Sequence, residues 1–406
     1  MATWFLVIIY LSFISLGLPD SMLGSAWPAI YPDIGASLES AGLLSMIAAG
    51  GTIVSSLASG FLIERLGTGR LTLLSCCLTA GALLGFSFAP SLLWLVVLAI
   101  PLGLGAGAVD SALNHYVANH YKAHHMSWLH CFWGVGATAG PIIMSLFIAN
   151  DSTWRDGYQA VAMIQFTLVV ILLLTLPLWN RVAALQQQLS LAEDGAHSNE
   201  TQPDDDHNAR TSRKNPLQIR GVKLTLIAFL FYCGVEMTVG LWGASFLVHT
   251  REFSADTAAA WVSLYFGGIT VGRLISGFIT MRVSGRAIIL SGQLIALFGG
   301  LLVLLPLPDV LTLTGIILIG MGFAPIYPSL IHETPARFGK EHSAKLIGYQ
   351  MAVAYTGTTF LPPLFGLVAA HTTMWLFPVT VIAFILIMLL CTEGVNRALK
   401  REVQNG

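Results

Sequence analysis

Residues 50–65 read GGTIVSSLASGFLIER and residues 267–282 read GGITVGRLISGFITMR, so the second stretch repeats the first 217 positions later. The two copies share a pair of glycines, a Ser-Gly-Phe triplet and a closing arginine. The same offset relates four further pairs of glycines and one pair of leucines: Gly17 and Gly234, Gly103 and Gly320, Gly105 and Gly322, Gly140 and Gly357, and Leu113 and Leu330. The chain therefore consists of two halves with the same order of segments.

The composition indicates a membrane protein. Hydrophobic residues make up 55% of the 406 residues and charged residues only 10%, whereas soluble proteins average about 25% charged residues. About twelve apolar segments are long enough to cross the ~30 Å hydrocarbon layer of a bilayer as helices. The net charge of −1 gives no reason to expect a nucleic acid partner. We expect an all-α, monomeric protein embedded in a lipid bilayer.

Twelve membrane helices are predicted, six in each half. The domains are then residues 1–180 and residues 221–406, joined by a polar cytoplasmic linker, residues 181–220, that is expected to be mostly disordered. We interpret residues 4–18 as a membrane helix and not as a signal peptide, because no basic region precedes them and Asp20 occupies the expected cleavage site. The predicted helices are residues 3–25, 39–63, 71–89, 93–117, 127–149, 158–180, 222–249, 256–281, 287–306, 309–331, 344–369 and 373–393.

Lysine and arginine are unevenly distributed between the loops. If both termini are cytoplasmic, the inner loops and the C-terminal tail hold 17 of the 20 basic residues, and the outer loops hold only Arg155 and Arg251. The remaining one, Arg273, lies inside a membrane segment. This positive-inside bias predicts cytoplasmic termini and an even number of helices. We expect a multi-pass protein of a plasma membrane, namely the inner membrane of a bacterium.

Disulfides and metal sites are not expected. The five cysteines all lie in apolar segments, with no paired spacing outside them, so we interpret them as free thiols. One polar connector contains or adjoins three histidines, His120, His124 and His125, but no cluster of acids supports them as metal ligands. The sequence therefore predicts no metal.

Acidic residues inside the predicted membrane helices are the main candidates for a functional site. Residues 101–116 read PLGLGAGAVDSALNHY, in which Asp110 and Asn114 share one face of a helix. A carboxylate at mid-depth costs several kcal/mol unless it faces a cavity or a partner, which favours a functional role for Asp110. A buried structural hydrogen bond is the alternative.

Asp20 is the second candidate. It lies in a segment that Gly17, Pro19 and Gly24 loosen, as suits a helix that borders a moving cavity. The alternative is a solvated cap close to the outer surface. Burial disfavours the charged form of a carboxyl group, and a group poised near ambient pH gains and loses a proton readily. We therefore predict that Asp20 and Asp110 bind and release a proton whose movement across the membrane is coupled to that of a solute. We expect no cofactor.

Further polar and aromatic residues complete the predicted solute site. His130 either binds the solute or forms a hydrogen bond within the helix packing, and Trp242 either stacks on a sugar ring or packs against lipid and other helices. Arg273 either snorkels toward the surface or pairs with an acid. A later helix is expected to break near Pro325. The predicted solute-binding residues are Asp20, Asp110, Asn114, His130, Glu236, Trp242, Tyr327 and Gln350, with Tyr355 as a further candidate on the same helix as Gln350.

The loop after the second predicted helix resembles the signature loop of the major facilitator superfamily. It reads Gly60-x3-Glu64-Arg65-x-Gly67-x2-Arg70, and its second copy keeps Arg282, Gly285 and Arg286 but has Met281 in place of the acid. We expect Gly60 to permit close helix packing, and the acid and the arginines to form charge contacts that favour one gate state. An ordinary basic loop is the alternative. The predicted gating residues are Gly60, Glu64, Arg65, Arg70 and Arg282.

Within that superfamily the chain resembles the fucose:proton symporter branch, over nearly all of its length except residues 181–220. This resemblance implies that Asp20 and Asp110 are the acid pair for proton coupling and sugar binding, and that Asn114 and His130 bind hydroxyl groups. The superfamily plan is two parallel six-helix bundles with the solute site between them near the midplane. The residues that carry the resemblance are Asp20, residues 103–114, residues 129–136, residues 234–236 with Trp242, and residues 324–328.

These observations predict a secondary active transporter that moves a small polyhydroxylated solute, a sugar or a polyol, together with a proton by alternating access. Two alternatives stay open: a proton-driven exporter of drugs or metabolites, and a receptor on a transporter scaffold that binds solute without moving it. The sequence contains no Gly-x4-Gly-Lys-Ser/Thr loop, which argues against an ATP-driven pump. No arrangement typical of an enzyme nucleophile stands out, so we do not expect an enzyme.

Overall fold

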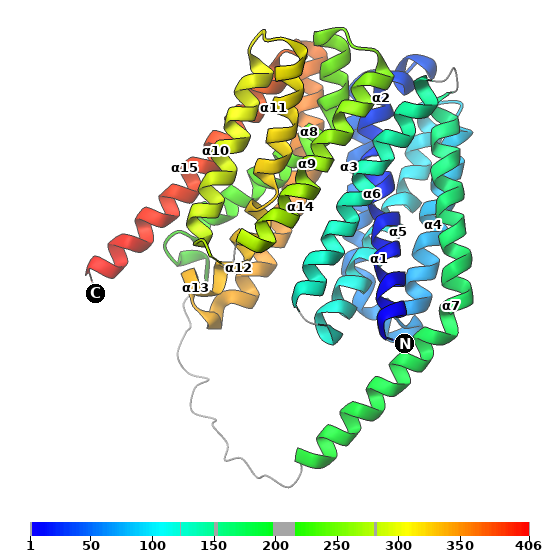
Figure 1. The fold of residues 1–406 in the computed structure, drawn as a ribbon, viewed down its shortest axis with the longest axis vertical. Helices are drawn as coiled ribbons and strands as arrows, with labels where there is room; N and C mark the ends of the chain where they lie inside the picture. Colours follow the sequence, from blue (N-terminus) through cyan, green and yellow to red (C-terminus); the bar gives the residue numbers. More distant parts are fainter. Residues whose placement is uncertain (1, 122, 150–152, 198–215, 280–281, 406) are drawn as a thin grey trace.

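The computed structural model describes residues 2–121, 123–149, 153–197, 216–279 and 282–405, which form helices joined by turns (Figure 1). Among these residues, twelve segments of 20 to 30 residues are long and apolar enough to cross a membrane. At 1.5 Å per residue such helices are about 30–45 Å long, which matches the thickness of a bilayer. The predicted all-helical membrane fold with twelve spans is confirmed.

The first half of the chain supplies six of these spans. The first span is built from two helices, α1 and α2, which are separated by a turn at Ser21, next to Pro19. The helices of this half are α1 (Ala2–Asp20), α2 (Met22–Asp33), α3 (Ser40–Leu66), α4 (Thr68–Ser87), α5 (Leu92–His120), α6 (Ala123–Ala149) and α7 (Trp154–His197).

The second half repeats this plan. Its fourth span breaks at Pro325, as predicted, because proline has no amide hydrogen to continue the helical ladder. Its helices are η1 (Pro216–Gln218), α8 (Val222–Arg251), α9 (Ala255–Ile279), α10 (Gly285–Leu304), α11 (Asp309–Phe323), α12 (Ile326–His332), α13 (Thr334–Phe338), α14 (Lys340–His371) and α15 (Leu376–Asn405).

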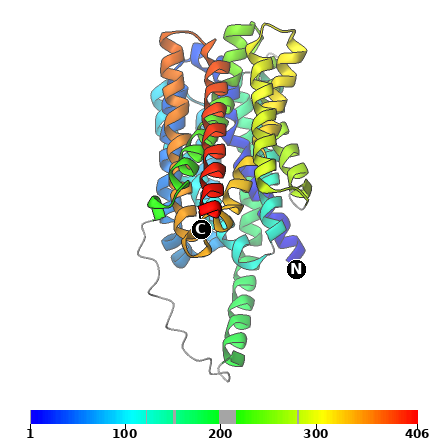
Figure 2. The same cartoon turned by 90° about the vertical axis from the view of Figure 1, so that its left-hand side faces the viewer.

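Three predicted helices end too early, and the last of them, predicted to end at residue 393, continues as α15 to Asn405. The first helix does not end near residue 25, because α2 continues to Asp33. The segment 181–197 is not a disordered linker but the continuation of α7, which extends beyond the other helices (Figures 1 and 2). Alanine, leucine, glutamine and glutamate dominate this segment and favour a helix without any tertiary contact. Residues 198–215 of the predicted linker lie outside the described residues.

The sequence repeat corresponds to equivalent helix contacts in the two halves. A Cβ atom at Gly103 of α5 would overlap the carbonyl oxygen of Ala48 on α3, and a Cβ atom at Gly320 of α11 would overlap the carbonyl oxygen of Tyr265 on α9. Ala48 and Tyr265 are themselves separated by the same 217 positions. Glycine is therefore needed at both places for backbones to touch, which is how membrane helices pack closely.

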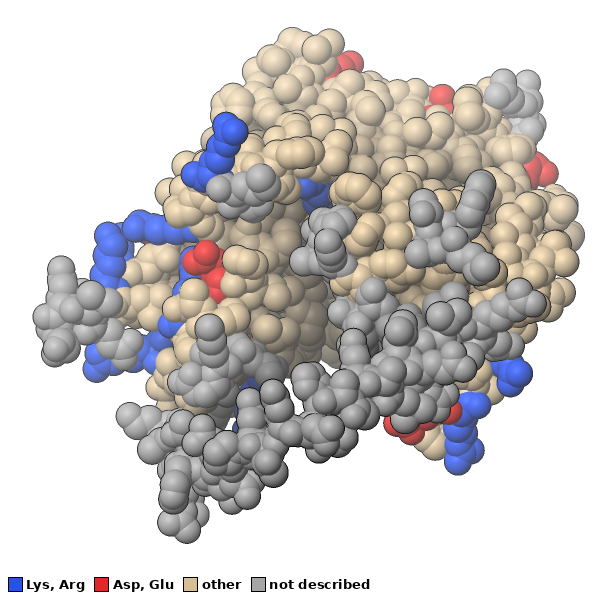
Figure 3. Space-filling view, turned by 60° about the horizontal axis from the view of Figure 1, so that its bottom comes forward, with Lys and Arg blue, Asp and Glu red and all other residues tan. Residues whose placement is uncertain are grey.

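The two halves meet away from the end of the bundle that carries the chain termini, here called the terminal end. The contacts between the halves are made mainly by α2 with α8 and α9, α3 with α14 and α6 with α9. Gly42, near the start of α3, lies against Pro363, and the Tyr31 hydroxyl lies 3.0 Å from His249 Nε2. Toward the terminal end the helices of the two halves diverge, and the face seen there is hollowed between them (Figures 1 and 3).

Candidate functional site

Asp20 lies near the middle of the first membrane-spanning segment, at the end of α1. The first span runs from Phe5 to Asp33, and the twelve residues of α2 add about 18 Å of helix beyond Asp20. Asp20 is nevertheless exposed, and its Oδ2 accepts a hydrogen bond from Trp133 Nε1 at 2.8 Å. The alternative of a cap at the outer surface is therefore wrong, because the continuation of the helix places this carboxyl group at mid-depth.

Asp110 lies on α5, close enough to Asp20 for the two carboxyl groups to interact electrostatically. Its Oδ1 accepts a hydrogen bond from Asn114 Nδ2 at 2.9 Å, one helical turn further on. Both side chains are partly exposed, so the pair is not sealed in a dry core. The fold thus brings together the two acids that the sequence singled out, although 90 positions of sequence separate them.

The opposite half contributes an ion pair inside the membrane. Arg273 Nη2 of α9 lies 3.3 Å from Glu236 Oε1 of α8, and the two side chains are only 17% and 15% exposed. The Tyr232 hydroxyl is a further neighbour of Arg273, and the Tyr265 hydroxyl donates to the backbone carbonyl of Glu236. Of the two interpretations of Arg273, pairing with an acid is therefore confirmed.

Trp133 of α6 connects Asp20 of one half to the ion pair of the other. Its indole N–H donates to Asp20, and the Arg273 guanidinium carbon lies 5.2 Å from the centre of its ring, within the range of a cation–π contact. Sequence reasoning did not single out Trp133. One signal was present, because it lies three residues after His130 and so faces nearly the same direction on α6.

Three other candidates border the same region. The His130 ring packs edge-on against Phe13 and is close enough to Arg273 to interact with it electrostatically. The Tyr327 hydroxyl donates to the sulfur of Met351 at 3.2 Å. Tyr355 of α14 interacts electrostatically with Asp110 across the boundary between the halves. All three candidate side chains are partly exposed.

Comparison with known proteins identifies the family. The sequence profile of the Major Facilitator Superfamily matches residues 9–331 and 224–404, which together cover nearly all of the chain. The chain belongs to the Major Facilitator Superfamily. The predicted membership of the superfamily is thus confirmed, and the protein is a transporter and not an enzyme. The narrower resemblance to fucose:proton symporters stays a prediction.

Relatives with curated descriptions are distant. The glucose/mannose transporter GlcP of Bacillus subtilis is 23% identical over 325 residues, which cover 79% of this chain and 77% of GlcP. Bypass of stop codon protein 6 of Saccharomyces cerevisiae is 23% identical over 280 residues, which cover 66% of this chain. The chain spans only 56% of the length of that yeast protein.

Solved structures share the fold of this superfamily member. The inward open conformation of the xylose transporter XylE from E. coli has a TM-score of 0.72 at 12% identity and covers 96% of each chain. A D-xylose-proton symporter has a TM-score of 0.71 at 15% identity, covering 96% of this chain and 98% of its own. A bacterial homolog of the human lysosomal transporter Spinster, in an inward-facing and unoccupied conformation, also reaches 0.71 at 12% identity, covering 98% and 97%.

Two predicted solute ligands do not face the region between the halves of this transporter. Trp242 is fully buried, donates its indole N–H to the carbonyl of Pro362 at 2.8 Å, and packs edge-on against Phe365. Gln350 is also buried and donates its side-chain amide to the Thr334 hydroxyl at 2.9 Å. Their polar groups are occupied by helix packing, so the structure corrects their assignment to the solute site in this conformation.

The signature loop of the superfamily is only partly as expected. A Cβ atom at Gly60 would meet nothing within 4 Å, so this glycine does not serve close packing here. None of the ion pairs between described residues involves Glu64, Arg65 or Arg70; the Arg65 guanidinium instead lies 4.2 Å from the centre of the Phe61 ring. Arg282 is likewise exposed and outside these pairs. The charge contact appears in the second copy, where Arg286 pairs with Glu393 at 2.8 Å.

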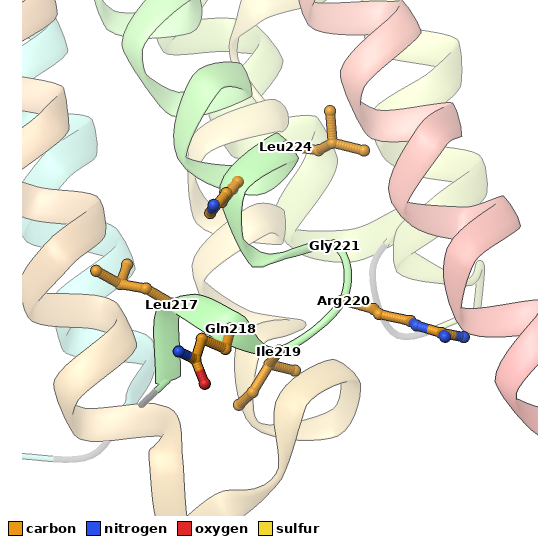
Figure 4. Close-up of a pocket in the computed structure, with 7 residues that line it drawn as sticks. Leu217, Gln218, Ile219, Arg220, Gly221 and Leu224 are labelled. Atoms are coloured by element: carbon orange, nitrogen blue, oxygen red, sulfur yellow. The ribbon is translucent and has the colours of Figure 1, made fainter. Parts of the chain in front are cut away.

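One pocket of about 370 Å³ lies elsewhere, at the start of α8 (Figure 4). Residues 217–221, Lys223 and Leu224 line it. Glu236 lies twelve residues further along the same helix, about 18 Å away, so this pocket is separate from the membrane acids.

Metal ligands are absent from the described side chains, which contain no group of three or more histidines, cysteines or acids close enough to hold an ion. Of the three connector histidines, only His125 has a described side chain, and its Nδ1 lies 2.8 Å from the Tyr10 hydroxyl. The side chains of His120 and His124 lie outside the described ones.

Proposed function

We propose that this transporter is a proton-coupled symporter of a small polyhydroxylated solute, a sugar or a polyol, in the inner membrane of a bacterium. The observation that carries the proposal is the exposed carboxyl group of Asp20 at mid-membrane, with Asp110 beside it. Ionisable groups inside a membrane protein mark solute and proton pathways, because a charged side chain at mid-depth costs several kcal/mol unless it faces a cavity or a partner. A carboxyl group that is open to the space between the halves can bind and release a proton there.

The chemistry of the surrounding side chains supports a solute rich in hydroxyl groups. The carboxylates accept hydrogen bonds, the Asn114 amide donates and accepts them, and the Tyr327 hydroxyl does both. His130 adds a ring nitrogen, and the ring of Trp133 offers a face on which a sugar can stack. The relative GlcP is named a glucose/mannose transporter, and one solved neighbour is named a D-xylose-proton symporter, which agrees with this solute class.

The direction of opening follows from the charge distribution. We place the terminal end in the cytoplasm, because the loops and tail at that side hold most lysines and arginines of the sequence. The hollow between the halves opens toward that end (Figure 3), so the conformation is inward-open. The names of two structural neighbours, which describe inward-facing and inward open conformations, agree with this assignment.

Transport into proteoliposomes tests the proposal. The purified protein is reconstituted with an alkaline interior, and uptake of radiolabelled D-glucose, D-mannose, D-xylose, L-fucose and mannitol is followed with and without a protonophore. A gradient of one pH unit is worth about 1.4 kcal/mol, so one proton per solute drives about tenfold accumulation. Protonophore-sensitive accumulation of one of these solutes supports symport.

The acid at the centre of the proposal has its own variant. Asp110→Asn is expected to abolish accumulation driven by the pH gradient while exchange of solute across the membrane survives. The amide still forms hydrogen bonds, but it does not take up or release a proton as a carboxyl group does. Asp309→Asn, at the exposed first residue of α11, is the matched control and should accumulate solute normally. Normal accumulation by Asp110→Asn contradicts the coupling role. If the unsubstituted protein accumulates solute only under a reversed pH gradient, it is an exporter. If it binds solute without taking it up, it is a receptor.

A further inference from the structure

Among the described side chains, Trp133 contacts both an acid of the first half and the ion pair of the second. Its N–H edge faces the Asp20 carboxylate at 2.8 Å, and its ring lies 5.2 Å from the Arg273 guanidinium. The backbone around it is held tightly, because a Cβ atom at Gly17 would overlap the Trp133 carbonyl oxygen and Gly134 lies against Thr270 of α9. Trp133 therefore lies where α1, α6 and α9 meet.

The two contacts of this indole depend on each other. A hydrogen bond to an ionised carboxylate is roughly twice as strong as one to a neutral acceptor, so the bond weakens when Asp20 is protonated. A carboxylate at the N–H edge also pushes electron density into the ring, and a more electron-rich ring attracts a cation more strongly. Ionised Asp20 thus strengthens the hold of Trp133 on Arg273, and protonated Asp20 relaxes it.

We propose, building on the proposed proton coupling, that Trp133 is a positioning residue that transmits the protonation state of Asp20 to Arg273 across the boundary between the halves. With Asp20 ionised, the contact between Trp133 and Arg273 holds α6 against α9, and the conformation described here is favoured. With Asp20 protonated, the contact with Trp133 weakens and Arg273 is held mainly by Glu236 and Tyr232 of its own half, so α6 and α9 separate more readily. Proton binding in one half thereby changes the balance between the two conformations of the transporter.

Several other ionisable groups face this region and must be separated from Asp20 in any pH experiment. The first half contributes Asp110 on α5 and both His130 and Cys131 on α6, whereas α3, α4 and α7 bring no charged residue to the same depth. The second half contributes Glu236 and Tyr232 on α8 and Arg273 on α9. Asp110→Asn is therefore tested beside Asp20→Asn, so that the response of each acid is measured alone.

The test measures the conformation without any solute. Nitroxide labels are attached to Leu57→Cys on α3 and Phe278→Cys on α9, which are 82% and 70% exposed and lie in different halves toward the terminal end, after the five native cysteines are replaced. Pulsed electron spin resonance then gives the distances between the labels in lipid nanodiscs. We expect the unsubstituted background to change the ratio of long to short distances on the order of tenfold between alkaline and mildly acidic pH.

Trp133→Phe keeps an aromatic ring and removes the N–H, so we expect it to lose at least half of this pH response. Asp20→Asn should give one distribution at every pH, resembling that of the acidic background, while Asp110→Asn should keep the response. Trp94→Phe is the matched control, because it removes an indole N–H that donates to a backbone carbonyl, that of Gly85, and not to a carboxylate. It should respond like the background.

A full pH response in Trp133→Phe overturns the inference, and so does a background that does not respond to pH. Thermal denaturation of each variant identifies one that is merely unfolded, and in that case Trp133→Tyr, which keeps a ring but not the indole N–H, replaces Trp133→Phe with the same expected loss. The proposed function is judged separately by solute accumulation in proteoliposomes. Coupled accumulation together with an unchanged response in Trp133→Phe therefore rejects the role of Trp133 alone.

Discussion

Glu236→Gln, which breaks the membrane ion pair with Arg273, should lower the free energy of unfolding more than Glu393→Gln, which breaks a shorter ion pair at the surface. Removing one partner of a buried pair costs about 3–5 kcal/mol, because it leaves the other charge buried without compensation. Arg273 keeps the face of Trp133, a contact worth about 0.5–2 kcal/mol, and it also keeps the glutamine oxygen as a neutral acceptor. We therefore expect a loss of about 2–3 kcal/mol in the free energy of unfolding.

The surface pair of Arg286 and Glu393 provides the comparison. Its 2.8 Å separation is shorter than the 3.3 Å of the membrane pair, but its side chains are 44% and 22% exposed instead of 17% and 15%. Water screens the exposed charges, so Glu393→Gln should cost only about 0–1 kcal/mol. Burial, and not distance, is predicted to decide the ranking of the two variants.

The assay is unfolding by sodium dodecyl sulfate in mixed micelles, followed by circular dichroism. A double variant of Glu236→Gln with Arg273→Met removes both charges and should recover at least half of the lost stability. If Glu236→Gln costs no more than Glu393→Gln, or if the double variant recovers nothing, Arg273 is not a buried charge that depends on Glu236. In that case the ion pair assigned to the centre of the protein is wrong.

Three further predictions address packing and pH. Gly103→Ala should cost about 1–3 kcal/mol of unfolding free energy, because the new methyl group overlaps the Ala48 carbonyl. Gly60→Ala should leave the unfolding free energy unchanged in the same assay, because its methyl group meets nothing. Equal costs for the two variants would contradict this packing. Trp242→Phe should lower the free energy of unfolding by about 1–3 kcal/mol and leave D-glucose affinity in a binding assay unchanged, since the indole is buried away from the hollow. Weaker binding with unchanged stability would show that Trp242 belongs to the solute site. A hydrogen bond from its own backbone amide holds the pKa of Glu39, between the first two spans, below its usual value. Its contribution to stability is present at neutral pH and disappears as pH falls through that lowered pKa, so Glu39→Gln should destabilise at pH 7 and not in acid, which thermal melts at several pH values measure.

Sequence alone determined the membrane class, the number of spans and the repeated plan. Length and hydropathy are enough for the spans, because every backbone polar group inside a bilayer must be paired within its own helix. The repeat at an offset of 217 corresponds to equivalent contacts in the structure, since Gly103 and Gly320 pack against the backbones of Ala48 and Tyr265. The break near Pro325 followed from the missing amide hydrogen of proline, a property of one residue.

Only the tertiary structure decided which polar residues look into the space between the halves. Trp242 and Gln350 have the same residue chemistry as good solute ligands, yet they are buried in packing, while Tyr355 and Trp133 reach toward the acids. Lipid tails are as apolar as a protein core, so a membrane helix can be apolar on every side and its sequence does not show which face is buried. The facing of each side chain is set by how twelve helices pack, and the pairing of Glu236 with Arg273 across two helices arises only from that packing.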